Sequence, residues 1–179
     1  MKRVLILYGW GGSDAPHWQA WLANELQTKG IAVSFPKLPN KEMPLFHEWK
    51  KTLLQELDSF KPDTVICHSL ANLLWLRLCH ENAITATYKH LILVAPPAPD
   101  RPIPELNSFF PLGLPKNIHA HTALLITSSN DPYLTQDEAA TLASLLPVQH
   151  LSLLNAGHIN SAGGYGPWPW LCEYILKQS

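Results

Sequence analysis

Three residue types that can carry out acyl transfer occur along this chain in the order serine, aspartate, histidine. Ser69 follows a short apolar run and precedes a strongly apolar segment, so we predict that it lies at a sharp turn from a strand into a helix. Such a turn exposes the hydroxyl beside the free N–H groups of the helix and makes it a candidate nucleophile. Cys67 and Ala71, two residues to either side, are small, as close strand–helix packing requires. Asp131 and His158 come later, in the order that hydrolases with this turn use.

Each of the two later residues has a defined chemical role in this hypothesis. Asp131 lies in the loop 128–134 after an apolar run and can accept the Nδ1–H of a histidine. His158 is the predicted base because the ordinary pKa of histidine lies near neutral pH. Taken singly, the serine is more typical of a helix N-cap, the aspartate of a turn, and one of nine histidines of a surface or core position. The combination favours catalysis, with Asp131 preferred over the alternative acid Asp100 because it follows a late strand.

Backbone N–H groups near these residues are candidate oxyanion donors. One is the N–H of Leu70, which directly follows the nucleophile, and the other is that of Trp10 in the glycine-containing loop 8–13. Glycines in this loop permit a close approach of the backbone. A dinucleotide-binding loop is excluded because Asp14 stands where its third glycine is required.

The elements that must position these residues alternate in type along the chain. Continuous apolar runs are typical of strands buried on both faces of a parallel sheet. Four such runs predict strands at 4–7, 65–66, 91–94 and 123–126. Two segments with a weaker pattern, 31–35 and 149–153, are further candidate strands. Apolar stripes or a capping box predict helices between them, at 18–26, 46–57, 70–78, from 135 onward and 168–177. We therefore predict an α/β fold, a three-layer sandwich with a mostly parallel sheet of about six strands.

Composition bounds the class of protein. The 179 residues are 46% hydrophobic and 15% charged, with a net charge of −1, which favours a single globular domain over 1–179. Neither a basic nucleic-acid footprint nor a membrane span is predicted. Three cysteines without metal-site spacing predict free thiols in the cytoplasm: Cys67, Cys79 and Cys172. His119 and His121 have no third ligand near them in the sequence, so we predict no metal and no cofactor.

Residues 96–117 interrupt the alternation, because seven of the 16 prolines fall there and proline opposes regular structure. The segment follows a strand and so belongs to the sheet edge where α/β folds bind ligands. It is either a rim over the active site or a stiff surface connection. We expect a shallow site for small acyl groups, lined by aromatic residues: Trp10, Phe109, Phe110 and Trp168.

Several motifs resemble those of the YdeN-like small serine hydrolases, a family that includes the retinoblastoma-binding serine hydrolase. They run through nearly the whole chain: Gly9-Trp10-Gly11-Gly12-Ser13 with His17-Trp18, Leu38-Pro39-Asn40, Cys67-His68-Ser69-Leu70-Ala71, Ser129-Asn130-Asp131-Pro132-Tyr133, and Gly157-His158-Ile159-Asn160 followed by Gly163, Gly164, Gly166 and Trp168. The resemblance implies an α/β-hydrolase-like fold without a cap domain. It also implies a triad of Ser69, Asp131 and His158 that hydrolyses small esters or amides without a cofactor.

The chain departs from the family pattern at a few positions. Tyr8 stands where many members have histidine. Cys67 and Ala71 replace the glycines that usually flank the nucleophile in the sharp turn from strand to helix, the nucleophile elbow. The retinoblastoma-binding motif Leu-x-Cys-x-Glu is not reproduced, because Arg77 takes the place of its leucine, so that partner is not predicted. The alternative to an esterase or amidase is a weak or inactive hydrolase-fold module that binds a ligand or a protein.

Overall fold

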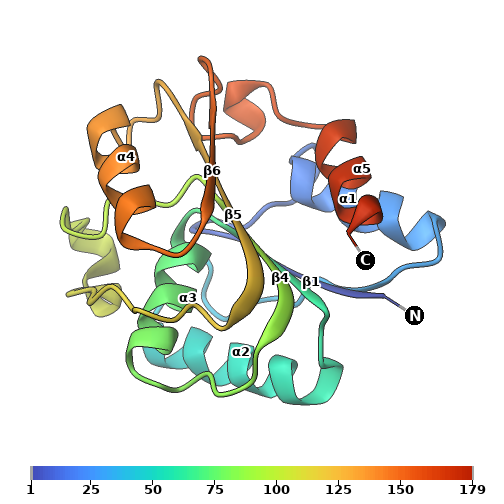
Figure 1. The fold of residues 1–179 in the computed structure, drawn as a ribbon, viewed down its shortest axis with the longest axis horizontal. Coiled ribbons are helices and arrows are strands. Elements are labelled where there is room, and N and C mark those ends of the chain that lie inside the picture. Colours follow the sequence, from blue (N-terminus) through green and yellow to red (C-terminus); the bar gives the residue numbers. More distant parts are fainter. Residues whose placement is uncertain (1, 179) are drawn as a thin grey trace.

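A computed structural model describes residues 2–178, and its centre is a six-stranded parallel sheet with helices on both faces (Figure 1). The strands are β1 (Arg3–Leu7), β2 (Ala32–Ser34), β3 (Thr64–His68), β4 (Tyr88–Val94), β5 (Ala120–Ser128) and β6 (Gln149–Leu153). Their order across the sheet is β2-β1-β3-β4-β5-β6, and every neighbouring pair is parallel. All six predicted strands are present, which confirms the predicted three-layer sandwich.

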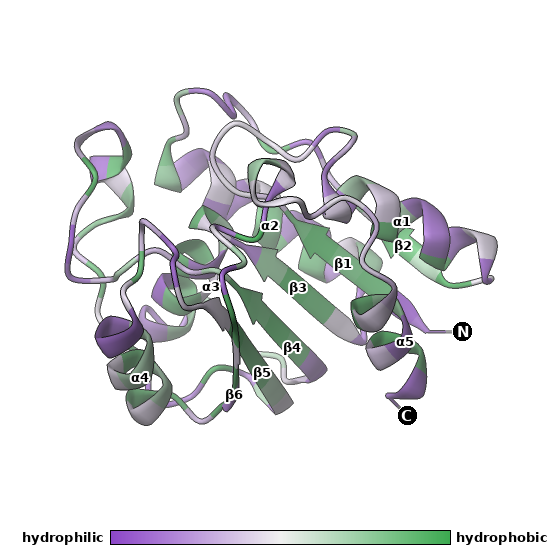
Figure 2. Cartoon of the chain, turned by 90° about the horizontal axis from the view of Figure 1, so that it is seen from above, coloured by the Kyte–Doolittle hydropathy of each residue, from purple (hydrophilic) through white to green (hydrophobic). Residues whose placement is uncertain are grey.

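Two separate hydrophobic cores form because successive strand residues point to opposite faces of the sheet. On β1, Leu5 and Leu7 pack toward one core, whereas Val4 and Ile6 pack toward the other. The first core is covered by α2 (Phe46–Phe60), α3 (Leu70–His80) and α4 (Gln136–Leu145), and the second by α1 (Trp18–Thr28) and α5 (Pro169–Lys177). Figure 2 shows the strands as the most hydrophobic layer, with hydrophilic residues on the outer sides of the helices. Burial on both faces explains why these strands lack polar alternation.

Local signals in the sequence set several helix ends. Thr135 and Glu138 form the predicted capping box at the start of α4, each side chain bonded to the backbone of the other. Gly30 directly follows the C-cap of α1 with φ at +78°, a conformation that glycine adopts without steric cost. Nine of the eleven residues of α3 are buried, in agreement with a helix that is apolar around most of its circumference.

The site-forming edge of the sheet lies where β1 and β3 end side by side. The chain leaves β1 toward α1 on one face and leaves β3 toward α3 on the other face. The two connecting loops therefore diverge and leave a crevice between them, which is the position where open α/β sheets bind ligands.

The proline-rich segment contains one short regular element that the sequence did not predict. A 3₁₀ helix, η1 (Pro104–Phe109), begins with proline, which is tolerated there because the N–H it lacks would have no helical partner. Ser108 fixes it to the helical layer, because its hydroxyl accepts from the N–H of Phe46 (3.1 Å) and its carbonyl accepts from Arg77 (2.7 Å). The expectation of no regular structure was wrong for these six residues.

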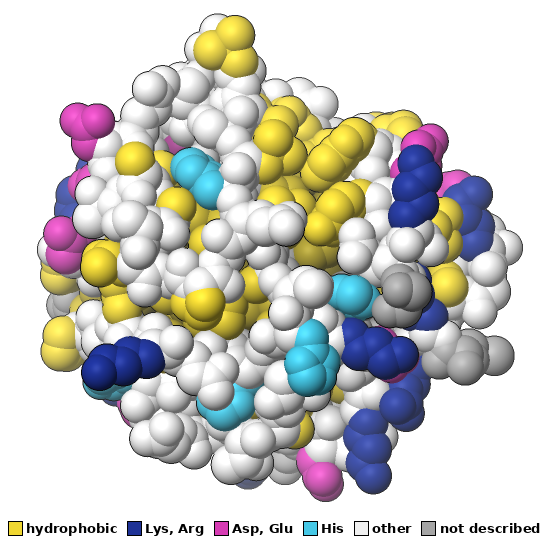
Figure 3. All heavy atoms as spheres, viewed as in Figure 1, with side chains coloured by type: hydrophobic (Ala, Val, Ile, Leu, Met, Phe, Trp, Pro, Cys, Tyr) yellow, Lys and Arg dark blue, Asp and Glu magenta, His cyan; other side chains and the backbone are white. Residues whose placement is uncertain are grey.

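The three cysteines are free and buried. Among the described residues, no helix has the length and apolar character needed to cross a membrane. On the face drawn in Figure 3, hydrophobic side chains gather toward the middle, and Lys and Arg lie mainly toward the edges.

Candidate active site

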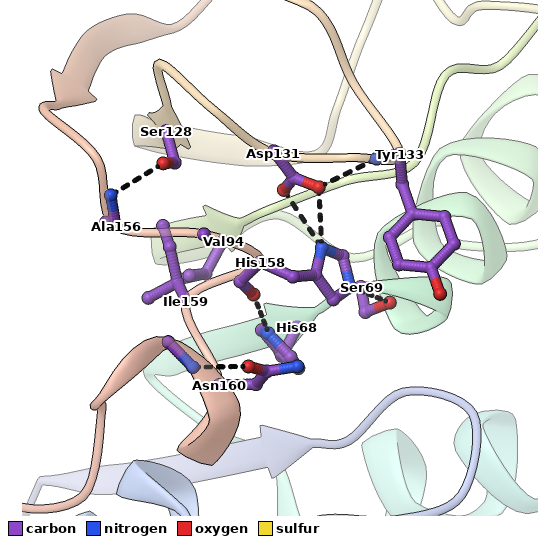
Figure 4. Close-up of polar contacts among 12 residues, drawn as sticks. His68, Ser69, Val94, Ser128, Asp131, Tyr133, Ala156, His158, Ile159 and Asn160 are labelled. Carbon is purple, nitrogen blue, oxygen red and sulfur yellow. Dashed lines mark hydrogen bonds and ion pairs between the residues drawn. The ribbon is translucent and has the colours of Figure 1, made fainter.

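The structure brings Ser69, His158 and Asp131 together at the carboxyl ends of the strands (Figure 4). The Oγ of Ser69 lies 2.8 Å from the Nε2 of His158. On the other side of the ring, Nδ1 lies 2.9 Å and 3.0 Å from the two carboxylate oxygens of Asp131. Serine, imidazole and carboxylate are therefore linked in the order that general-base activation of a hydroxyl requires. Asp100, the alternative acid, is exposed and lies outside this arrangement.

Ser69 occupies a strained turn between β3 and α3. Its backbone has φ of +53° and ψ of −121°, and its side chain makes no capping bond to α3, so the N-cap interpretation does not apply. Its N–H donates to the carbonyl of Val94 at 3.0 Å, which ties the turn to β4. Cys67 and Ala71 are fully buried within the first core. The sharp turn thus forms without the flanking glycines.

Hydrogen bonds between two loops set the position of His158. Asn130 accepts the N–H of Gly157 at 2.7 Å and the hydroxyl of Ser128 at 2.9 Å, both on Oδ1. The same hydroxyl of Ser128 accepts the N–H of Ala156 at 3.0 Å (Figure 4). Asp131 is also held, because Oδ1 accepts the N–H of Tyr133 at 2.9 Å. The acid loop and the histidine loop are therefore fixed to each other through the two residues that directly precede His158.

The glycine-containing loop after β1 passes directly over the nucleophile. A Cβ on Gly9 would lie 2.6 Å from the Cβ of Ser69 and 3.1 Å from its Oγ, so a larger residue could not pass there. The N–H of Trp10 has no backbone partner among residues 2–178, and the N–H of Leu70 is the first of α3, where no helical partner exists. Both N–H groups are thus free to donate, one from the residue after Gly9 and the other from the residue after Ser69.

Contacts with the segment after β2 hold this loop in place. The indole Nε1 of Trp10 donates to the carbonyl of Glu42 at 2.9 Å, and the N–H of Gly11 donates to the carbonyl of Lys41 at 2.9 Å. Tyr8, which replaces a histidine of the family pattern, is buried, and its hydroxyl bonds to both the N–H and the carbonyl of Leu38. The tyrosine therefore anchors the base of the loop to the same segment.

A cavity of about 270 Å³ opens onto Ser69 and His158. The proline-rich segment contributes Pro97, Ile103 and Leu106 to its wall, which supports the rim interpretation of that segment. The remaining wall contains residues of the glycine loop and of the segments that flank the triad: Gly9, Trp10, Gly12, His17, His68, Tyr133, Asn160, Ser161 and Ala162. Within residues 2–178, no group of three or more His, Cys, Asp or Glu could hold a metal ion.

Three of the four aromatic residues expected to line the site do not line this cavity. Phe109 is fully buried against Trp49 and Phe46, and Phe110 packs against the same core, because η1 turns its apolar side toward α2. Trp168 is buried edge-on against Trp18 in the second core. Only Trp10 remains in the wall. Sequence alone could not separate core aromatics from lining ones, because residue type and local pattern are the same for both.

Two histidines without a predicted catalytic role lie beside the triad. The ring of His68 packs 5.0 Å from that of His17 and 5.3 Å from that of His158, measured between centroids. Its Nε2 lies 3.1 Å from the carbonyl oxygen of His158 and must donate, because the carbonyl only accepts. Burial, and then the imidazoles of His158 and His17, lower the pKa of His68 well below 6.5. His17 is buried as well, and burial together with His158 lowers its pKa to about 4.

This pair of histidines predicts a loss of stability in mild acid. In the folded state the pKa of His17 is about 4, below the ordinary 6.5, so the unfolded chain takes up the proton first as the pH falls. Neutral His17 stabilises the folded state fully above pH 6.5, and this contribution to the free energy of unfolding decreases as the pH falls toward 4. For His17 alone, we expect the free energy of unfolding to fall by about 2 kcal/mol between pH 7.5 and pH 5. The titration of His68 acts in the same direction.

Urea unfolding of wild type and His17→Asn at the two pH values tests this expectation. Asparagine is a competent N-cap that does not titrate, so the variant should lose about 2 kcal/mol less than wild type on acidification. His47→Asn, which changes an exposed histidine on α2, is the matched control and should keep the wild-type pH dependence. An unchanged pH dependence in His17→Asn would show that this histidine does not stabilise the fold in its neutral form.

Comparison with known proteins identifies the family of this chain. A family model described as serine hydrolase matches residues 4–177 of the chain. The chain belongs to the serine hydrolase family. No curated protein sequence matched this hydrolase.

Solved structures similar to this serine hydrolase share its fold. The ydeN gene product from B. subtilis superposes with a TM-score of 0.86 at 22% identity, covering 99% of this chain and 98% of that chain. A structure described as a YdeN-like hydrolase, from Pectobacterium atrosepticum, superposes with a TM-score of 0.74 at 22% identity, covering 99% of this chain and 90% of that chain. An esterase domain from a Rhodothermus marinus protein superposes with a TM-score of 0.67 at 18% identity, covering 97% of this chain and 84% of that chain. The resemblance to the YdeN-like hydrolases is therefore confirmed.

Proposed function

We propose that this serine hydrolase cleaves small esters or amides through an acyl-enzyme on Ser69, with His158 as the base and Asp131 as the residue that orients it. The observation that carries the proposal is the continuous set of contacts from Ser69 Oγ to His158 Nε2 (2.8 Å) and from His158 Nδ1 to Asp131 (2.9 Å). With the carboxylate accepting Nδ1–H, the proton-free Nε2 faces the serine hydroxyl.

The first half of the reaction forms the acyl-enzyme. Nε2 of His158 takes the proton of Ser69 while Oγ attacks the substrate carbonyl, and the carbonyl oxygen becomes an oxyanion. The N–H groups of Trp10 and Leu70 stabilise that oxyanion, since neither has a hydrogen-bond partner in the backbone of residues 2–178. The protonated His158 then gives its proton to the departing alcohol or amine, and the carbonyl re-forms as an ester of Ser69.

The second half releases the acid and restores the enzyme. Water enters the vacated position, and His158 Nε2 takes one of its protons as the oxygen attacks the acyl-enzyme. The same two N–H groups stabilise the second oxyanion. When that intermediate collapses, the proton returns from His158 to Ser69 Oγ, and the carboxylic acid leaves.

The size of the cavity favours small substrates. A volume of about 270 Å³ lies at the lower end of ligand pockets, and the rim formed by Pro97, Ile103 and Leu106 limits the length of an acyl chain. Acyl hydrolysis is also the activity named for two similar folds, the esterase domain from Rhodothermus marinus and the RedJ thioesterase from Streptomyces coelicolor. We therefore favour a carboxylesterase with short acyl groups.

A fluorophosphonate probe tests the activated serine directly. The probe should add one phosphonyl group to the wild-type protein, visible as a single mass increase of the intact chain, and should add none to Ser69→Ala. Ser161→Ala is the matched control, because Ser161 lines the same cavity but has no contact with His158. This variant should be labelled as wild type is.

A folded wild-type protein that takes up no probe would contradict the proposal. The hydroxyl of Ser69 would then lack the nucleophilicity that the contact with His158 should supply. The alternative function, a hydrolase-fold module that binds a ligand or a protein through the same cavity, would be the better description.

A further inference from the structure

Two side chains outside the triad present hydrogen-bond donors to the active-site cavity in a fixed orientation. They are His17, at the start of α1, and Asn160, two residues after His158. Each is the N-cap residue of the helix that follows it, His17 for α1 and Asn160 for η2 (Ser161–Gly163). In each, the capping bond occupies the acceptor atom of the side chain.

The cap of α1 fixes the tautomer of His17. Its Nδ1 accepts the N–H of Gln19 at 3.1 Å, so Nδ1 carries a lone pair and the proton of the neutral ring is on Nε2. The side chain is only 6% exposed, and the ring forms part of the cavity wall. Nε2 has no hydrogen-bond partner among the described residues, yet it is not sealed from the cavity. A buried N–H of this kind is available to a ligand.

The cap of η2 fixes the amide of Asn160 in the same way. Its Oδ1 accepts the N–H of Gly163 at 3.0 Å, which turns the amide nitrogen away from the helix (Figure 4). The Nδ2 group has no partner among the described residues, and the residue lines the cavity with His17. Two donors with fixed orientation therefore line the same cavity, together with the apolar side chains of Pro97, Ile103 and Leu106.

The charge of the cavity indicates which acceptor these donors fit. Among the described residues that line it, none is Asp, Glu, Lys or Arg. The nearest cation at the glycine loop, Lys41, is paired with Asp14 at 2.7 Å. An anionic substrate group would find no counterion in the wall and would face the carboxylate of Asp131 behind His158. An uncharged carbonyl oxygen meets no such repulsion.

We propose that His17 and Asn160 form a subsite that recognises a second, uncharged carbonyl oxygen on the substrate, so that the preferred substrates are short oxo-substituted esters. This inference rests on the proposed hydrolase function. The donors Nε2–H and Nδ2–H bind the second carbonyl and thereby orient the scissile carbonyl over Ser69 Oγ. The two residues select the substrate by position and take no part in proton transfer.

Matched ester pairs test the subsite on both sides of the scissile bond. The acyl pair is p-nitrophenyl 4-oxopentanoate and p-nitrophenyl pentanoate, and the alcohol pair is 2-oxopropyl butyrate and 2-methylpropyl butyrate. In the pair whose second carbonyl reaches the subsite, we expect wild type to have a higher kcat/KM for the oxo ester than for its partner without that carbonyl. His17→Asn and Asn160→Ser keep a capping side chain but move or remove the donor, and each should lower that preference about three- to tenfold.

A comparison of ratios separates recognition from general damage. The intrinsic reactivity of the two esters cancels when the wild-type ratio is divided by the ratio in the variant. Thr135→Ala removes a comparable N-cap on α4, away from the cavity, and should leave the ratio unchanged. Unchanged ratios in both subsite variants, for both ester pairs, would overturn the subsite. Failure to hydrolyse any ester, with no fluorophosphonate adduct on Ser69, would instead overturn the hydrolase function itself.

Two further measurements examine the chemistry of the subsite. Carboxymethyl butyrate has a carboxylate where 2-oxopropyl butyrate has a ketone, and we expect it to be the poorer substrate. If it were the better one, recognition of an uncharged acceptor would be wrong. NMR correlation of the imidazole nitrogens of His17 with the ring protons should identify the Nε2–H form at pH 7, and the Nδ1–H form would remove the proposed donor.

Discussion

Asp131→Asn should lower kcat for ester hydrolysis by about 10⁴-fold while the protein stays folded. Oδ1 of Asp131 accepts the N–H of Tyr133, so the carbonyl oxygen of an asparagine would keep that place. The amide nitrogen would then take the place of Oδ2, 2.9 Å from the Nδ1 of His158. An N–H donor at that point favours the tautomer in which Nδ1 accepts it and the ring proton is on Nε2, facing Ser69, over the one in which the carbonyl oxygen, 3.0 Å away, accepts Nδ1–H. His158 in that tautomer cannot take the proton of the serine.

Steady-state kinetics with p-nitrophenyl butyrate, together with a thermal unfolding curve, measure this effect. Asp100→Asn is the matched control because it makes the same chemical change at the acid that the sequence offers as the alternative, and it should retain wild-type kcat. A folded Asp131→Asn protein with kcat within tenfold of wild type would rule out Asp131 as the orienting acid. The same loss in Asp100→Asn would assign that role to the proline-rich segment.

Asn72→Asp should destabilise the fold by about 3–5 kcal/mol, although the two side chains have nearly the same shape. Asn72 is fully buried on α3, and its Nδ2 donates to the carbonyls of Ser69 and Val94, both at 2.8 Å. A carboxylate would place negative charge against two carbonyl oxygens. The other amide atom, Oδ1, has no partner among the residues that the structure describes, so no donor there would compensate. Urea unfolding at pH 7 measures the loss.

Asn72→Leu separates the effect of charge from that of the lost hydrogen bonds. Leucine has a similar volume and also removes the unpartnered Oδ1, so we expect a loss of stability well below that of the aspartate variant. This variant lacks the two hydrogen bonds by which Asn72 on α3 holds the carbonyls of Ser69 and of Val94 on β4. The position of Ser69 is then less well fixed, so kcat should fall even where the fold is retained. Equal stability of the Asp and Leu variants would show that a carboxylate beside these two carbonyls costs no more than the loss of the two hydrogen bonds.

Strand and helix positions followed closely from the sequence because burial leaves a strong pattern. The strands are buried on both faces, so their residues form unbroken apolar runs such as Val4–Leu7. The capping box of α4 needs only residues 135 and 138, which lie one turn apart. Local chemistry of this kind needs no knowledge of distant contacts. The 3₁₀ helix in the proline-rich segment escaped prediction because Phe46 and Arg77, distant in the sequence, stabilise it through bonds to Ser108.

The aromatic residues show the limit of this approach. Phe109 and Trp10 both lie in segments that connect strands to helices, but one is fully buried and the other lines the cavity. Which one faces the cavity depends on how η1 packs against α2, a contact between residues more than fifty positions apart. His17 and Asn160 were in the motifs of the family, yet their donors acquire meaning only when two helix caps converge on one cavity.

The sequence by itself determined the order Ser69, Asp131, His158, the α/β alternation and the family, since these depend on residue type and on short-range periodicity. Tertiary structure alone decided how the three side chains meet, at 2.8 and 2.9 Å, and which neighbours surround them. It also decided that Cys67 and Ala71 permit the strained turn, because that depends on how β3 and α3 pack within the first core. Such distances arise from the packing of elements far apart along the chain, and no local pattern encodes them.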